Sequence, residues 1–113
     1  MKILVVGSGA REHVLAWKLA GEAGVTEVLC TPGNAGIAQM ARCLPSDPAD
    51  PRTLLAIARR EAVDLTVVGP ELPLSRGVVD LFKAEGLPIV GPTRSAAALE
   101  SSKAFAKAFM ARH

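Results

Sequence analysis

The chain has 113 residues, half of them hydrophobic, which is enough apolar material for one globular domain with a core of its own. Its 13 basic and 11 acidic side chains leave a net charge of +2, and only 4% of residues are aromatic. That balance argues against a nucleic-acid or membrane surface, and the few aromatic residues argue against base stacking. No apolar run approaches the roughly 20 residues that span a bilayer, and MKILVVGSG is too short for a signal peptide. We therefore expect a cytoplasmic protein that binds neither nucleic acid nor membranes.

The first third of the chain predicts a strand, a helix and a second strand. Residues 2–6 form a short apolar run that ends in a glycine, which is typical of a strand buried on both faces of a parallel sheet. An apolar stripe predicts a helix over 10–20, and 27–31 has the composition of a second strand. A loop with two glycines follows, and then a short helical piece around Ala38.

Proline and capping residues mark the next elements. Three prolines between residues 43 and 51 predict mostly turn, and Asp50 can cap a helix that has Pro51 at its first position and runs to about Glu61. Three further elements follow, namely a strand over 64–69, a helix over 75–85 and a strand over 87–91.

Strands alternate with helices along most of the chain, which predicts an α/β fold with a parallel sheet. Residues 94–100 and 102–112 both look helical, and the second segment has no stop signal. This uncapped end indicates a piece of a longer protein.

Loops rich in glycine follow the carboxyl ends of the predicted strands. In an open parallel sheet these ends lie at one edge, where ligands bind. We expect the loops to converge there: Gly7-Ser8-Gly9-Ala10-Arg11-Glu12-His13, Pro32-Gly33-Asn34-Ala35-Gly36, Gly69-Pro70-Glu71 and Gly91-Pro92-Thr93.

The first loop opens a helix whose N-terminal amides suit a phosphate, and Arg11 can add a charge-assisted contact. It is a poor dinucleotide motif, because Glu12 takes the place of the third glycine and the second strand ends without an acidic residue. The alternative is that the glycines only permit a tight turn.

The other candidate residues also have structural alternatives. Glu71 is well placed to hold vicinal ribose hydroxyls, or else caps a helix or forms a salt bridge. Asn34 lies between glycines and can occupy a left-handed turn. Glu12 suits the helix dipole, and His13 is more often structural than catalytic. The two cysteines form no CxxC pair and have no histidine at metal-ligand spacing, so we expect two buried or half-buried thiols.

Taken together, GSGAREH, PGNAG, VDLTVVGPE and GPT, followed by LESSKAFAKAFMARH, closely resemble the amino-terminal domain of phosphoribosylamine–glycine ligases. The resemblance covers essentially the whole chain. It implies a Rossmann-like open parallel sheet with helices on both faces, a pre-ATP-grasp domain. Residues 1–93 would form the substrate-binding domain, and 94–113 a linker and the start of a truncated ATP-grasp domain.

The resemblance also implies an activity in purine biosynthesis. Such enzymes join glycine to 5-phosphoribosylamine and split ATP, with Mg²⁺ or Mn²⁺ at the ATP phosphates, mostly on other domains. By motif, Gly9, Ala10, Arg11 and Glu12 would lie at the phosphoribosyl group, bordered by Asn34, with Glu71 at the ribose hydroxyls. Lys103 resembles a lysine that reaches ATP.

Two residues depart from the family pattern, because Ala10 and Ser101 stand where glycine is usual. We expect the first loop to survive this change, and the fragment alone to make no glycinamide ribonucleotide. The alternatives are the equivalent domain of another ATP-grasp enzyme and a non-catalytic nucleotide-binding module.

Overall fold

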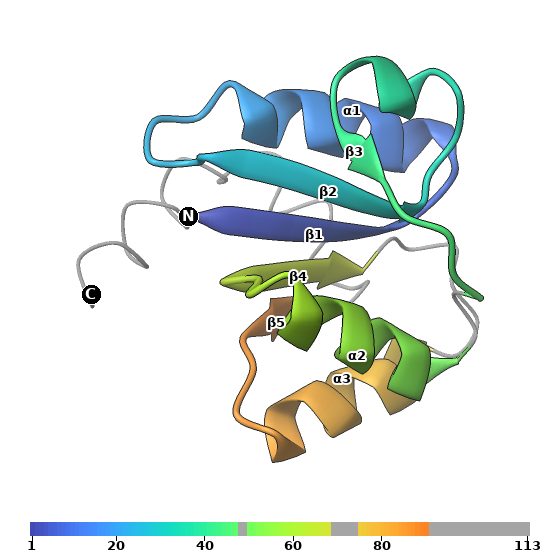
Figure 1. Ribbon diagram of the computed structural model, residues 1–113, viewed down its shortest axis with the longest axis vertical. Helices are drawn as coiled ribbons and strands as arrows, with labels where there is room; N and C mark the ends of the chain where they lie inside the picture. Colours follow the sequence, from blue (N-terminus) through green and yellow to red (C-terminus); the bar gives the residue numbers. More distant parts are fainter. Residues whose placement is uncertain (48–49, 69–74, 91–113) are drawn as a thin grey trace.

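A computed structural model describes residues 1–47, 50–68 and 75–90 of the chain. Its centre is a parallel sheet of five strands in the order β3-β2-β1-β4-β5 (Figure 1). The strands are β1 (Lys2–Gly7), β2 (Glu27–Pro32), β3 (Arg42–Cys43), β4 (Leu65–Val68) and β5 (Ile89–Val90). The helices are α1 (Ala10–Ala20), the short 3₁₀ helix η1 (Ile37–Gln39), α2 (Pro51–Arg60) and α3 (Ser75–Ala84).

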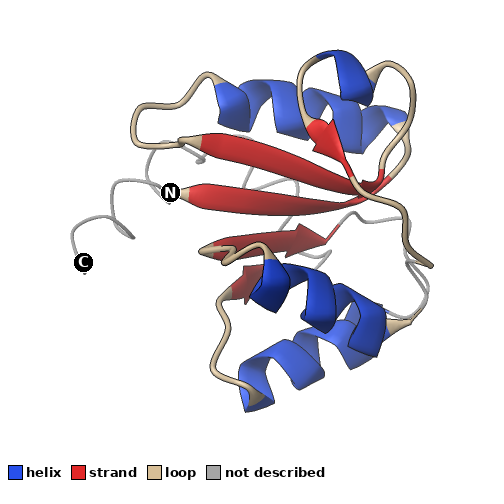
Figure 2. Ribbon diagram, in the orientation of Figure 1, coloured by secondary structure: helices blue, strands red, loops and turns tan. Residues whose placement is uncertain are grey.

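Alternate residues of the strands point to opposite faces of the sheet, and helices cover both faces (Figure 2). On one face, Ile3 and Val5 of β1 belong to a core cluster that includes Leu15 of α1 and Ile37 of η1. On the other face, buried strand residues pack against α2 and α3. The strand residues are Leu4, Val6, Leu29 and Val68, and the helix residues are Leu54, Leu55, Ile57, Ala58, Val78 and Phe82. The near-continuous apolar runs in the strands follow from this two-sided burial. The expected Rossmann-like sheet with helices on both faces is confirmed.

The helix start predicted at Asp50 is also confirmed. Asp50 is the N-cap of α2, and its carboxylate accepts hydrogen bonds from the backbone N–H of Arg52 at 3.1 Å and from the hydroxyl of Thr53 at 2.8 Å. The first of these bonds satisfies an amide that the first helical turn cannot pair internally. Both also hold the pKa of Asp50 below its usual range, with the Thr53 bond as the largest cause.

The structure adds β3 to the four predicted strands. This strand has only two residues, in register with Leu29 and Cys30, so no periodic pattern could reveal it before the prolines that follow. Its position at the edge next to β2 completes the strand order: from β1 the chain adds β2 and β3 on one side and then crosses to add β4 and β5 on the other, so the reversal of strand order lies between β1 and β4. That reversal is the switch point at which doubly wound sheets bind ligands. The second expected domain, 94–113, lies outside the described residues.

Within the described ranges, no helix is both long and apolar enough to cross a membrane.

Candidate functional site

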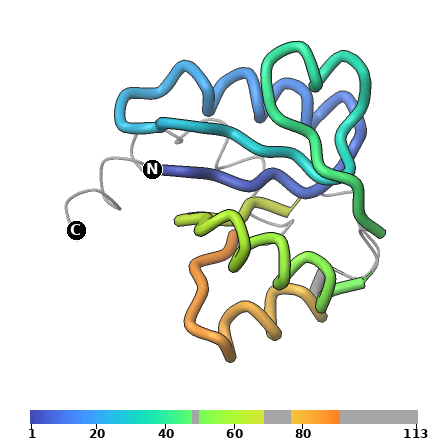
Figure 3. Tube along the Cα trace, in the orientation of Figure 1, coloured from blue at the N-terminus to red at the C-terminus, as the bar shows by residue number. Residues whose placement is uncertain are grey.

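Two of the four glycine loops meet at the carboxyl edge of the sheet (Figure 3). The backbone N–H of Gly33 donates to the carbonyl oxygen of Gly7 at 3.1 Å, which extends the pairing of β1 with β2 by one bond. The side-chain amide of Asn34 donates to the carbonyl oxygen of Ser8 at 2.6 Å. The β1–α1 loop and the β2–η1 loop are therefore one connected surface, as their positions after neighbouring strands predict. The other two loops, with Glu71, lie outside the described residues.

The start of α1 offers backbone amides to this surface. Gly9 is the N-cap, and Ala10 and Arg11 occupy the first helical positions with exposed side chains. The N–H groups of a first helical turn have no partner within the helix and carry the positive end of the helix dipole, so they suit an anion. The guanidinium of Arg11 adds a formal positive charge on the same turn.

Glu12 lies beneath the loop and not on its exposed side. Its side chain is 2% exposed, and its Oε1 accepts a hydrogen bond from the N–H of Gly9 at 3.1 Å. This bond is the helix half of a capping box. Glu12 therefore acts on the conformation of the β1–α1 loop, whereas the family resemblance placed it among the residues at the phosphoribosyl group.

Asn34 does not occupy the left-handed turn that was the structural alternative for this residue. Gly33 has the positive φ, 73°, and among the described non-glycine residues only Ala62 has one. Asn34 instead uses both ends of its amide, because its Oδ1 accepts from the N–H of Ile37 at 2.9 Å while its Nδ2 donates to Ser8. Asn34 thereby holds the first residue of η1 and ties it to the first loop.

The end of β2 disfavours a dinucleotide. An acidic residue there would hold a ribose hydroxyl in the usual NAD site, but the strand ends at Thr31 and Pro32, joined by a cis peptide bond. The hydroxyl of Thr31 makes bonds of 2.6 Å with the carbonyl oxygen of Leu44 and the hydroxyl of Ser46. Thr31 therefore serves the connection after β3.

The two cysteines are free thiols on neighbouring strands, with Cys30 buried and Cys43 half-buried. The prediction of two buried or half-buried thiols is confirmed. Burial raises the pKa of the Cys30 thiol to about 12, and the nearby Cys43 and Glu12 contribute in the same direction. The thiol also donates to the carbonyl oxygen of Gly7 at 3.4 Å.

These surroundings predict unequal reactivity toward iodoacetamide. The thiolate is the reactive form, so a thiol with a pKa of about 12 is ionised in only about one molecule in 10⁴ at a pH of about 8. We expect alkylation of the native protein to occur at Cys43 first, as measured by mass spectrometry of peptides. A Cys43→Ser control should be labelled slowly when native and fully in urea. Equal labelling of Cys30 in both states would contradict the assignment.

The described residues contain no group of three or more His, Cys, Asp and Glu side chains that could hold a metal ion. Lys103, the expected contact to ATP, lies outside them.

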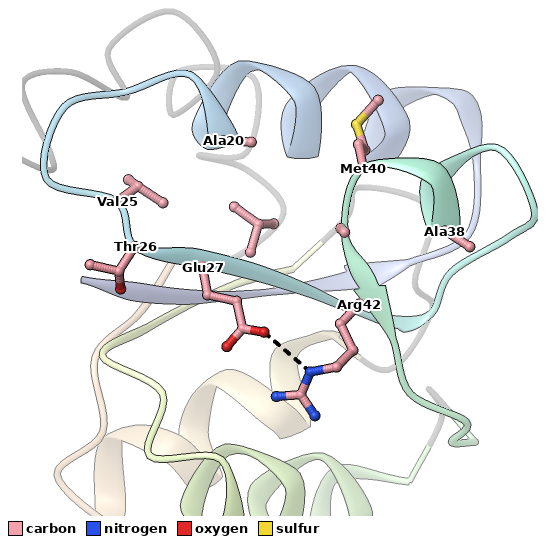
Figure 4. Close-up of a pocket in the computed structure, with 9 residues that line it drawn as sticks. Ala20, Val25, Thr26, Glu27, Ala38, Met40 and Arg42 are labelled. Carbon is pink, nitrogen blue, oxygen red and sulfur yellow. Dashed lines mark hydrogen bonds and ion pairs between the residues drawn. The ribbon is translucent and has the colours of Figure 1, made fainter.

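A pocket of about 380 Å³ lies at the other end of the sheet (Figure 4). It is lined by Ala20 at the end of α1, by residues 25–28 at the start of β2, and by Ala38 and residues 40–42. Among the lining residues, Nε of Arg42 donates to Oε2 of Glu27 at 3.2 Å, and this contact lowers the pKa of the Glu27 carboxyl group. Because it lies at the amino ends of the strands, this pocket is separate from the loops described above.

Comparison with known proteins identifies the family. The family model described as phosphoribosylglycinamide synthetase, N domain, matches residues 1–100. The whole chain aligns with phosphoribosylamine–glycine ligases from Xanthomonas campestris at 63% identity and from Ralstonia nicotianae at 60% identity. It spans 27% of the length of each of these relatives.

A structural comparison agrees on the fold. The solved structure of a glycinamide-RNase-transformylase T from Mycobacterium tuberculosis matches 79% of this chain and 26% of its own, with a TM-score of 0.63 and 22% identity. At that identity the likeness concerns the fold alone. The match over 100 of 113 residues is decisive, and the chain belongs to the phosphoribosylglycinamide synthetase N-domain family.

Proposed function

We propose that this chain is the phosphoribosyl-binding domain of a phosphoribosylamine–glycine ligase. The single observation that carries the proposal is the joined pair of loops at the carboxyl edge, where exposed Arg11 and the first-turn amides of α1 lie beside a loop tied down by Asn34. Such a surface suits a dianionic phosphate, because amides, the helix dipole and a guanidinium all favour negative charge. The relatives at 60–63% identity are phosphoribosylamine–glycine ligases, which supports phosphoribosylamine as the substrate.

In this proposal the residues have distinct roles. The amides of Ala10 and Arg11, with the Arg11 side chain, hold the phosphate of 5-phosphoribosylamine, and Gly9, whose own amide donates to Glu12, lies beside it. Asn34 borders the ribose, and Glu71 binds its vicinal hydroxyls. Glu12 contributes indirectly, since its bond to Gly9 fixes the loop that carries the amides.

The reaction belongs to the whole enzyme, which we propose acts in the cytoplasm. The carboxylate of glycine attacks the γ-phosphorus of ATP, and ADP leaves. The amine of phosphoribosylamine then attacks the acyl carbon of the resulting glycyl phosphate, phosphate leaves, and the amine loses a proton to give glycinamide ribonucleotide. Lys103 would reach ATP, while other domains would supply most contacts to ATP and its Mg²⁺ or Mn²⁺.

A chimeric enzyme tests the proposal directly. We would replace the matching N-terminal part of the X. campestris ligase with this chain and measure ADP release that depends on both glycine and phosphoribosylamine. The chimera should turn over, whereas the 113-residue chain alone should not. A folded chimera without amine-dependent turnover would contradict the proposed function.

In the same chimera, Arg11→Ala should raise KM for phosphoribosylamine more than KM for ATP. Losing one hydrogen bond to a charged group costs about 1.5–3 kcal/mol, or roughly 10- to 150-fold in affinity. Lys18→Ala is the control, because it removes an exposed cation from the last turn of the same helix. An unchanged KM for the amine in Arg11→Ala would contradict the role of Arg11.

A further inference from the structure

His13 makes a contact that the proposed function does not use. It lies on α1, one turn after the N-cap, where its N–H donates to the carbonyl oxygen of Gly9 at 3.1 Å. Its half-buried imidazole reaches the β2–η1 loop at Gly36. A methyl group on the Gly36 Cα would lie 3.1 Å from Cε1 and 3.3 Å from Nδ1 of the ring. The ring therefore packs directly against the backbone of the second loop.

The same point on Gly36 also lies close to Asn34. A methyl group there would be 3.3 Å from the Asn34 Oδ1, the atom that accepts from the N–H of Ile37. Thus a methyl group at position 36 would be in tight contact with both the imidazole and the Asn34 amide, and these groups would have to shift slightly to admit it. The spacing of PGNAG, which puts glycine two residues after the asparagine, avoids this contact.

Three contacts link the two loops, at increasing distance along the chain from the ends of β1 and β2. The bond from Gly33 to Gly7 lies at the end of the strands, the bond from Asn34 to Ser8 lies at the loop, and the ring of His13 lies against Gly36 one helical turn further along. Ala10 and Arg11 lie in the chain between Ser8 and His13, the two residues of the first loop and helix that contact Asn34 and Gly36. Holding this turn before a ligand arrives removes part of the ordering cost of binding.

We propose that His13 is a positioning residue, whose ring, seated on Gly36, holds the 33–36 loop against the amino end of α1 and so pre-assembles the phosphoribosyl site. The inference rests on the proposed function for the ligand, but the loop contact itself does not. His13 needs no contact with the substrate for this role. Gly36 is its partner, because the absence of a side chain there lets the ring approach the backbone closely.

The first experiment measures the loop without any ligand. In the unliganded chimera, amide hydrogen exchange of the peptide that contains Ile37 should become roughly 5-fold faster or more in His13→Ala, since the loop opens locally at lower cost. Val14→Ala is the matched control, because Val14 is the next residue on the helix and is 50% exposed. Unchanged exchange in His13→Ala would overturn the proposal.

The second experiment measures the consequence for binding. His13→Ala should raise KM for phosphoribosylamine roughly 3- to 10-fold, the range expected for ordering a loop, and leave kcat and KM for ATP nearly unchanged. Gly36→Ala should act in the same direction by displacing the ring. In the double variant the two effects should not add, since the ring that the new methyl group would displace is already absent.

The outcomes distinguish a positioning role of His13 from a role in stability alone. If melting temperatures fall in His13→Ala while KM for the amine stays constant, His13 only fills space and the inference is wrong. Additive effects in the double variant would also overturn it. If His13→Ala does not fold, His13→Phe keeps a planar ring at this position and should preserve slow exchange. If the chimera without substitutions shows no turnover that depends on phosphoribosylamine, the proposed function is contradicted. The exchange measurement still decides whether His13 holds the loop.

Discussion

Replacing Phe82 with alanine should lower the free energy of unfolding by about 3–5 kcal/mol. The Phe82 side chain is 0% exposed and, with Val78 of the same helix, belongs to the core cluster that joins α3 to β1 and β4. Removing the ring loses its transfer free energy and leaves a cavity, because the β-sheet beneath cannot collapse into the space. Urea unfolding followed by circular dichroism measures the change.

Trp17→Ala is the matched control for this prediction. The indole is larger than the Phe82 ring, but it is 64% exposed on the outer side of α1. Its loss should change the free energy of unfolding by only about 0.5 kcal/mol or less, as for most surface substitutions. Similar losses for Phe82→Ala and Trp17→Ala would show that the cluster between α3 and the sheet is not a close-packed core.

Gly7→Ala should cost about 1.5–5 kcal/mol and disturb the candidate site as well. Gly7 ends β1 with a φ of 147°, a conformation that costs other residues about 1–3 kcal/mol. A methyl group on its Cα would also overlap the Glu12 side chain, with Cδ only 2.6 Å away. Glu12 would have to move and give up its bond to Gly9, and the loss of a cap costs a further 0.5–2 kcal/mol or so. Urea unfolding measures the total.

Gly86→Ala separates the two causes. Gly86 also has a positive φ, 73°, but nothing lies within 4 Å of a methyl group there. This variant should therefore show backbone strain alone, about 1–2 kcal/mol. In addition, Glu12→Ala should cost less in the Gly7→Ala background than in the wild type, because the overlap disappears with the carboxylate. Equal losses for the two glycine variants, or additive effects of the pair at 7 and 12, would contradict the account.

Some elements of the fold could be predicted because their causes are local. The apolar runs in β1, β2 and β4 are short and continuous, as expected for strands that are buried on both faces of a parallel sheet. Asp50 and Pro51 mark a helix start through bonds that span only two or three residues. The short helical piece near Ala38 was predicted as well, and it corresponds to η1.

The candidate site could be located only as an edge of the sheet. Parallel strands place their following loops on the same side, so the meeting of the loops at Gly7 and Gly33 follows from chain order. The direction in which each side chain points does not follow from chain order. Glu12 and Arg11 are neighbours in the first turn, yet the helix turns about 100° between them, and only packing decides that Glu12 is the buried one.

The sequence by itself determined the class of the fold, the helix cap at Asp50 and the positions of the glycine loops, since each follows from a pattern or a contact within a short stretch of chain. Only the tertiary structure decided the strand order, because the two-residue β3 is specified by its pairing with β2 and not by its own pattern. Likewise, the bridge from Asn34 to Ser8 spans 26 residues, and the contact of His13 with Gly36 spans 23. Such contacts exist only once the sheet has brought the two loops to the same edge.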